Sequence, residues 1–214
     1  MKFLPNHACI LVVSIAAVGF ALTAHRPGWI VWRGASLSAL AGALAVGWAS
    51  LSEPLRITFG RFRRRAAGLK TAALVSGAVA VAVLYRILLG ASPWPATLGW
   101  FALPAAGIGA AEEVLWRGWM QGALGTTLGP CRAVFLSAGS HAAYKAALFM
   151  FPPEGVPSYS WSALLVLGGL TFCFGIALGG FRAREGSTFP PMAAHAVFDV
   201  LVYGHASAVP WWVW

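Results

Sequence analysis

Residues 160–180 read SWSALLVLGGLTFCFGIALGG, a stretch of 21 residues without a charged side chain. As an α-helix this stretch would be about 31 Å long, at about 1.5 Å per residue, and the hydrocarbon core of a bilayer is about 30 Å thick. A helix satisfies its own backbone hydrogen bonds inside lipid. The stretch therefore predicts a transmembrane helix.

The rest of the chain has the same character. It is 59% hydrophobic and only 10% charged, whereas a soluble domain has about 25% charged residues. This composition excludes a water-soluble monomer, and the plentiful apolar residues exclude disorder. We expect an all-α fold, a polytopic transmembrane helical bundle of about seven spans. The six further apolar stretches are 8–24, 34–52, 71–89, 96–124, 132–151 and 190–209.

The basic residues predict the orientation of these spans. Lys and Arg total 15 against six Asp and Glu, and positive loops favour the cytoplasmic side of a membrane. An N-terminus inside and a C-terminus outside put most of the positive charge in cytoplasmic loops, and put Trp29, Trp32, Trp94 and Trp161 at the outer interface. The residues then expected in the cytoplasm are Lys2, the basic loop at 56–70, Arg132, Arg182 and Arg184.

The chain divides by content into two parts of one integrated membrane domain. Residues 1–95 hold three spans without a motif, and residues 96–214 hold four spans with ionisable residues. Twelve arginines against three lysines are typical of a GC-rich bacterial genome, so we expect a bacterial inner membrane protein. The lipid bilayer is the expected partner, and nucleic acid is not, because the basic residues lie between apolar spans. Three widely spaced cysteines do not indicate a disulfide framework.

Ionisable side chains inside the spans are the main functional signal. Such groups cost several kcal/mol in hydrocarbon unless they face a partner or a wet cavity. Three of the six acids, Glu112, Glu113 and Asp199, fall inside predicted spans. The basic and imidazole side chains that fall in spans with them are Arg117, His141, Lys145 and His195.

The spacing of these residues predicts pairs. Glu113 and Arg117 are four residues apart, one helical turn, so the guanidinium can neutralise that carboxylate. Glu112 is rotated about 100° from Glu113 and is left free for chemistry. His195 and Asp199 are also four apart. We expect these groups and His141 to meet around one wet cavity, and we place Lys145 outside the site.

Three motifs in this order resemble those of the CPBP intramembrane proteases (CAAX protease and bacteriocin processing), which include the Rce1-like CAAX prenyl endopeptidases. The family pattern E-E-x-x-x-R is Glu112-Glu113-Val-Leu-Trp-Arg117 here, and H-x-x-x-N or H-x-x-x-D is His195-Ala-Val-Phe-Asp199. The second motif, F-x-x-x-H, ends at His141 but carries Ser137 in place of Phe. The resemblance covers roughly residues 100–205.

The resemblance implies peptide hydrolysis by activated water. It makes Glu112 and His141 the groups that activate the water, with Glu113 and Arg117 in support. It implies that His195 and residue 199 stabilise the oxyanion of the tetrahedral intermediate. We expect Asp199 mainly to orient His195. A carboxylate and an imidazole in a desolvated cavity suit general-base chemistry. A zinc ion on Glu112, His141 and His195 is an alternative; otherwise no cofactor is expected.

The substrate implied is a protein or lipidated peptide cut near a membrane-associated C-terminus. A sorting protease of the myxosortase kind is a finer version of this hypothesis. Two other functional classes stay open. One is a catalytically silent scaffold or immunity protein of the same fold, and the other is a proton-coupled transporter that uses Glu112, His141 and Asp199 as a relay.

Overall fold

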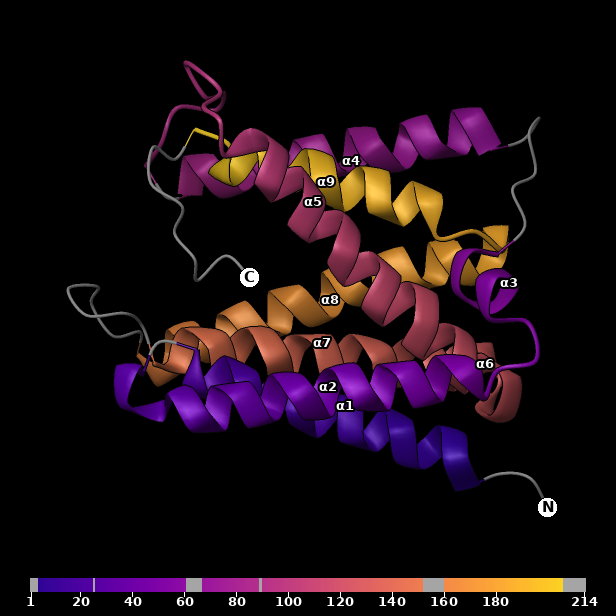
Figure 1. Ribbon diagram of the computed structural model, residues 1–214. Helices are drawn as coiled ribbons and strands as arrows, with labels where there is room; N and C mark the ends of the chain where they lie inside the picture. The colour runs from indigo at the N-terminus through magenta and orange to yellow at the C-terminus, as the bar shows by residue number, and fades with distance from the viewer. Residues whose placement is uncertain (1–3, 25, 61–66, 89, 152–159, 206–214) are drawn as a thin grey trace.

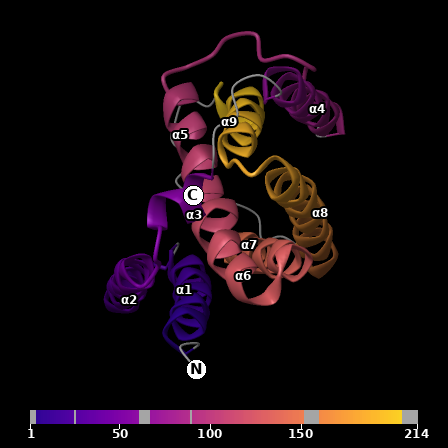
Figure 2. The same cartoon turned by 90° about the vertical axis from the view of Figure 1, so that its right-hand side faces the viewer.

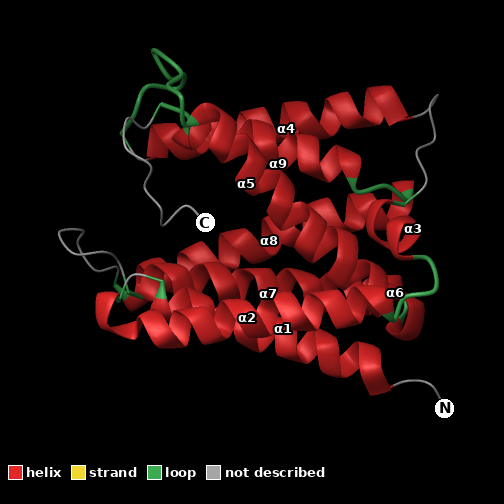
Figure 3. Cartoon of the chain, in the orientation of Figure 1, coloured by secondary structure: helices red, strands yellow, loops and turns green. Residues whose placement is uncertain are grey.

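The computed structural model describes residues 4–24, 26–60, 67–88, 90–151 and 160–205 (Figure 1). Within these ranges the chain is almost entirely helical and forms no strand (Figure 3), which confirms the all-α prediction. The elements are α1 (Leu4–Thr23), a 3-10 turn η1 (Pro27–Trp29), α2 (Ile30–Ala49), α3 (Pro54–Phe59), α4 (Ala67–Leu88), α5 (Ala102–Glu113), a π-helical segment η2 (Val114–Met120), α6 (Gln121–Leu128), α7 (Pro130–Met150), α8 (Trp161–Glu185) and α9 (Phe189–Tyr203).

Several helices are built to face lipid. Three are long and apolar enough to cross a membrane: Ile30–Ala49, Gly68–Leu88 and Trp161–Glu185. They expose large apolar side chains, such as Val31 at 77% and Leu165 at 75%, which is favourable against hydrocarbon and unfavourable in water. The fold is therefore a helical membrane bundle, as expected, and the total of about seven spans stays a prediction for the remaining helices.

The bundle has two halves joined by one oblique helix. α1 packs against α2 and α7, and α7 packs along α8. α4 and α5 each pack against α9. Viewed along the helices, α2, α1, α7, α8, α9 and α4 follow an arc (Figure 2). α5 crosses between the α4–α9 pair and the α7–α8 pair (Figure 1), so its C-terminal end lies near both halves.

The helix expected at 96–124 differs from the prediction in its bounds and in its form. It begins only at Ala102, after the break around Pro93 and Pro95, and continues to Leu128 with a π-helical turn from Val114 to Met120. A π-helical turn frees a backbone carbonyl from its usual partner, and such turns are frequent at functional sites. Here the hydroxyl of Ser137 in α7 donates to the carbonyl of Trp116 at 2.5 Å.

The stretch expected to be a basic loop at 56–70 includes part of a short helix, which its charge pattern did not predict. α3 covers Pro54–Phe59, and Gly60 follows it with φ 75°, a conformation that favours glycine. A Cβ on Gly60 would also lie 1.7 Å from the carbonyl oxygen of Gly186. Residues 61–66 of the same loop lie outside the described residues.

Other helix ends shift by a few residues. The span expected at 71–89 begins at Ala67, the one expected at 160–180 continues to Glu185, and the one expected at 190–209 ends at Tyr203. The C-terminal tryptophans lie outside the described residues. Basic residues at the end of α8 interact with the negative end of the helix dipole, which explains why the helix passes Gly180 and continues through Arg182 and Arg184.

The connections predicted to be cytoplasmic lie at one end of the bundle (Figure 1). The α3–α4 and α8–α9 connections meet there, through an antiparallel bridge between Gly60 and Ser187. Arg182 at the end of α8 donates to the carbonyl of Ile57 in α3, and Lys70 pairs with Glu185. The structure thus agrees with the predicted alternation of loops, while the side of the membrane that each end faces stays a prediction.

Candidate active site

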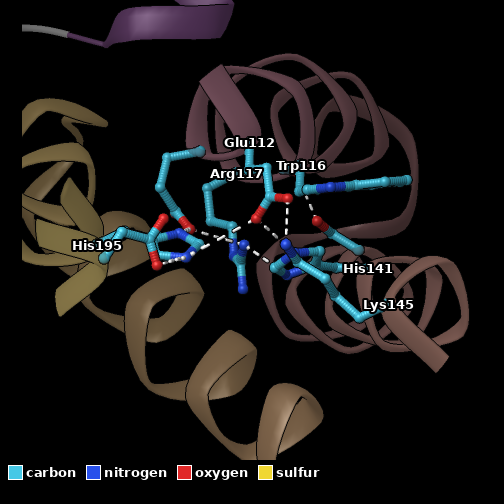
Figure 4. Close-up of polar contacts among 9 residues, drawn as sticks. Glu112, Trp116, Arg117, His141, Lys145 and His195 are labelled. Carbon is cyan, nitrogen blue, oxygen red and sulfur yellow. Dashed lines mark hydrogen bonds and ion pairs between the residues drawn. The ribbon is translucent and has the colours of Figure 1, made fainter. Parts of the chain in front are cut away.

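The six residues expected to form the site converge in the bundle interior. Glu112 and Glu113 close α5, Arg117 lies in the π-helical segment, His141 comes from α7, and His195 and Asp199 come from α9. None of their side chains is more than 9% exposed. Figure 4 shows Glu112 and Arg117 between His141 on one side and His195 on the other. Because α5 crosses the bundle obliquely, its C-terminal residues lie near side chains of both α7 and α9.

Glu112 lies at the centre of the cluster. Its Oε2 is 3.1 Å from Nε2 of His141 and 3.7 Å from Nε2 of His195. Its Oε1 is 2.5 Å from Nζ of Lys145 (Figure 4). The expectation that Lys145 stands outside the site was therefore wrong: it lies one turn after His141 on α7, on the same face of the helix.

Glu113 and Arg117 form the expected pair, and Glu113 also holds a histidine. Nη1 of Arg117 donates to Oε1 of Glu113 at 2.8 Å. The same oxygen is 2.9 Å from Nδ1 of His195. A carboxylate only accepts hydrogen bonds, so Nδ1 of His195 carries a proton in this contact. Glu113 thus connects α9 to α5, in addition to neutralising Arg117.

His141 is fixed in one tautomer by its neighbours. Nη1 of Arg117 lies 3.0 Å from Nδ1 of His141. A guanidinium has no acceptor atom, so Nδ1 must accept, and the proton of the neutral ring is on Nε2. That N–H then donates to Glu112. The ring of Trp116 stacks on the imidazole with centroids 5.6 Å apart, which holds the ring plane.

Asp199 contacts His195 less closely than expected. Its Oδ1 is 3.7 Å from Nε2 of His195, whereas Glu113 is 2.9 Å from Nδ1. The other oxygen of Asp199 lies against α5, where a Cβ on Gly109 would be 2.6 Å away. The shorter contact that orients His195 therefore comes from Glu113 and not from Asp199.

Two apolar cavities of about 370 Å³ each flank the cluster. The first, which we call the glutamate cavity, is lined by Glu112, Trp116 and Tyr144 together with residues of α1 and α2. The second, which we call the lysine cavity, is lined by Lys145, His141, His195 and Asp199 together with Phe174 and other apolar residues of α4, α8 and α9. Cavities of this volume are typical of ligand sites, and both end at the central cluster.

Sequence reasoning missed three residues of the site. Lys145 could have been found from its position one turn after His141. Trp116 was placed only as packing beside the motif, and it is 1% exposed and stacks on His141. Ser137 was expected only as a departure from the family pattern. Its hydrogen bond to Trp116 depends on the π-helical turn, for which the sequence has no signal.

Comparison with known proteins gives one result. A model of the family described as type II CAAX prenyl endopeptidase, Rce1-like, matches residues 92–201. Neither the curated proteins nor the solved structures gave a match. The matched segment contains all six site residues and Lys145, with the whole of α7 and α9 as far as residue 201.

Proposed function

Because the chain belongs to the Rce1-like family of type II CAAX prenyl endopeptidases, we propose that it is an intramembrane endopeptidase. It cleaves a peptide bond near the membrane-associated C-terminus of a protein or lipidated peptide. The observation that carries this proposal is the meeting of Glu112, His141 and His195 from three helices in one buried cluster. Burying such groups is costly, and active sites are a common reason for it.

Glu112 is the general base in this proposal. His141 donates from Nε2 to Oε2 of Glu112 and so orients the carboxylate. Of these two groups, only the carboxylate can accept a proton from water. The water oxygen bonds to the scissile carbonyl carbon while its proton passes to Glu112. The C–N bond then breaks, and Glu112 returns the proton to the leaving amine. His141 acts here by orienting Glu112, because its own Nε2 already carries a proton.

His195 and Asp199 face the developing oxyanion in the same scheme. Nδ1 of His195 already carries the proton that faces Glu113, so Nε2 donates to a carbonyl oxygen only when the ring is an imidazolium. The carboxylates of Glu112 and Asp199, each 3.7 Å from Nε2, favour that charged form. Glu113 holds Nδ1 of the same ring and fixes the direction of Nε2. Fixed donors of this kind stabilise a tetrahedral intermediate without reorganisation.

Zinc on Glu112, His141 and His195 suits the donor set poorly. A zinc ligand must present an unprotonated nitrogen, yet Arg117 donates to Nδ1 of His141 and leaves the proton on the Nε2 that faces Glu112. Lys145 adds an ammonium 2.5 Å from the carboxylate. In the described part of the chain, no group of three or more His, Cys, Asp or Glu side chains is arranged to hold a metal. We therefore propose metal-independent hydrolysis.

The class of activity is tested with purified protein in detergent. The probe is a dye-labelled peptide that ends in a farnesylated Cys-a-a-X sequence, the C-terminal signal that the family description names. We expect cleavage after the modified cysteine, read by mass spectrometry, and no proton-coupled uptake by the same protein in liposomes. Uptake without cleavage would make the chain a transporter, and neither activity would make it a scaffold.

A further inference from the structure

Lys145 occupies the oxygen that the proposed reaction needs. Nζ of Lys145 is 2.5 Å from Oε1 of Glu112, and His141 donates to Oε2. Both oxygens of the general base therefore have a cationic or N–H partner in this state. The charge of the ammonium favours the ionised carboxylate over the protonated one, so transfer of a proton from water to Oε1 is more favourable once Nζ moves aside.

An ammonium that leaves Glu112 needs another anion. The lysine cavity is mainly apolar, lined by side chains such as Leu167, Leu170 and Phe198, and an unpaired charge there costs several kcal/mol. Asp199 lines the same cavity, but one of its oxygens faces His195 and the other lies against Gly109. Asp199 is the only acid among the described residues that line this cavity, so an anion on the substrate would give the ammonium a new partner there.

We propose that Lys145 binds the C-terminal carboxylate of the substrate in the lysine cavity. This inference rests on the proposed function, and it names the part of the substrate that the site recognises. When the carboxylate enters, Nζ exchanges Glu112 for it, and Oε1 becomes free to accept a proton from water. Recognition of a chain terminus and release of the general base are then one event.

The geometry also assigns a direction to the substrate. The segment that ends in the free carboxylate lies in the lysine cavity, where Phe174 and Leu170 suit aliphatic side chains. The chain before the scissile bond lies on the side of the glutamate cavity, which α1 and α2 help to form. A lysine side chain is long, flexible and partly exposed here, at 15%, so Nζ has room to change partner.

The test compares two peptides that differ in one group. Both are the farnesylated peptide named above, one with a free C-terminal carboxylate and one with a C-terminal amide. Binding is measured by fluorescence anisotropy and cleavage by kcat/KM, for wild type, Lys145→Met and Lys145→Arg. Wild type is expected to prefer the acid by about tenfold or more, Lys145→Met to bind both peptides about equally, and Lys145→Arg to keep part of the preference.

The ratio of affinities for the acid and the amide peptide distinguishes carboxylate recognition by Lys145 from a purely structural role of Lys145. If Lys145 only neutralises Glu112, Lys145→Met weakens both peptides alike and the acid preference is unchanged, which would overturn the inference. A wild-type protein that binds acid and amide equally overturns it as well, whether or not it cleaves either. Loss of the preference in binding by an enzyme that cleaves neither peptide would support the carboxylate site while the proposed hydrolysis fails. Lys145→Arg, which retains the charge, guards against a Met variant that does not fold.

Discussion

At the scale of single residues, the hydrogen bonds of the site are organised by Arg117, whose guanidinium donates hydrogen bonds and cannot accept them. Arg117 has only N–H groups, so its contacts with Glu113 and His141 fix the proton positions of the cluster. The proton of His141 points to Glu112, and a proton on Nδ1 of His195 points to Glu113. The guanidinium thereby fixes the proton of His141 and the Glu113 carboxylate fixes that of His195, which leaves Glu112 as the base.

The two carboxylates near His195 should differ in importance. Glu113 is 2.9 Å from Nδ1 and Asp199 is 3.7 Å from Nε2. We expect Glu113→Gln to reduce kcat/KM by about 100-fold or more, because the charged acceptor for His195 is lost, and Asp199→Asn to reduce it by less than about tenfold. The two variants are compared by kcat/KM across pH. A larger loss of kcat/KM for Asp199→Asn than for Glu113→Gln would show that Asp199, and not Glu113, orients His195.

Ser137 replaces the phenylalanine of the family pattern, and the structure indicates a structural role for its side chain. Its buried hydroxyl donates to the carbonyl of Trp116 in the π-helical segment. Ser137→Ala leaves that carbonyl without this partner and should lower the free energy of unfolding by about 1–3 kcal/mol. Thermal unfolding in detergent measures the change, with Ser162→Ala on the exposed start of α8 as a control. An unchanged melting temperature for Ser137→Ala would show that the carbonyl does not depend on Ser137.

At the scale of elements, α3 and α6 approach so closely that only glycine fits. A Cβ on Gly122 would lie 2.4 Å from the carbonyl oxygen of Ile57, whereas a Cβ on Gly180 in α8 has nothing within 4 Å. Arg182 donates to the same carbonyl and to that of Gly118. The short helix α3 is therefore fastened against the π-helical segment that carries Arg117.

This close approach predicts opposite signs for the same substitution. Alanine in a helix is more stable than glycine by about 1 kcal/mol, so Gly180→Ala should raise the melting temperature slightly. Gly122→Ala should lower it, because Ile57 and α3 must move away. Scanning fluorimetry in one detergent compares the two variants directly. Equal, stabilising effects at both positions would mean that α3 is not held against α6.

The sequence predicted elements better than their junctions. Apolar stretches located the long helices because hydrophobicity follows the bilayer, and the i, i+4 spacing predicted the Glu113–Arg117 pair because it is a property of one helix. Contacts between helices were harder to predict from the sequence. Lys145 meets Glu112 through the crossing of α5 and α7, and α3 lies in a stretch that its arginines made look like a loop. Such features depend on tertiary packing, which spacing along one chain does not encode.

At the scale of the whole molecule, the two ends of the bundle differ in charge and in aromatic content. Trp29, Trp32, Trp94 and Trp161 are all exposed, at 44–71%, and lie in or beside connections at one end, as an aromatic belt would. Arg182 and Arg184 lie in the last turn of α8, and α8 ends at the other end of the bundle (Figure 1). The charge bias predicts that the arginine end faces the cytoplasm.

Cysteine labelling tests this orientation. In a chain with Cys9, Cys131 and Cys173 replaced by serine, the exposed positions Arg184 and Ser92 are changed to cysteine one at a time. A membrane-impermeant maleimide added to intact cells should label Ser92→Cys and not Arg184→Cys. Both should be labelled after lysis. Labelling of Arg184→Cys in intact cells would reverse the predicted orientation.

The central claim is that the Glu112 carboxylate takes a proton from water to hydrolyse a peptide bond. It is tested most directly by kcat/KM of Glu112→Gln on the farnesylated free-acid peptide, with Glu53→Gln at the half-exposed end of α3 as the matched control. We predict a loss of about 100- to 10,000-fold for Glu112→Gln, as expected for removal of a general base, and no change for Glu53→Gln. Near wild-type cleavage by a folded Glu112→Gln protein would contradict the assignment of Glu112 as the base.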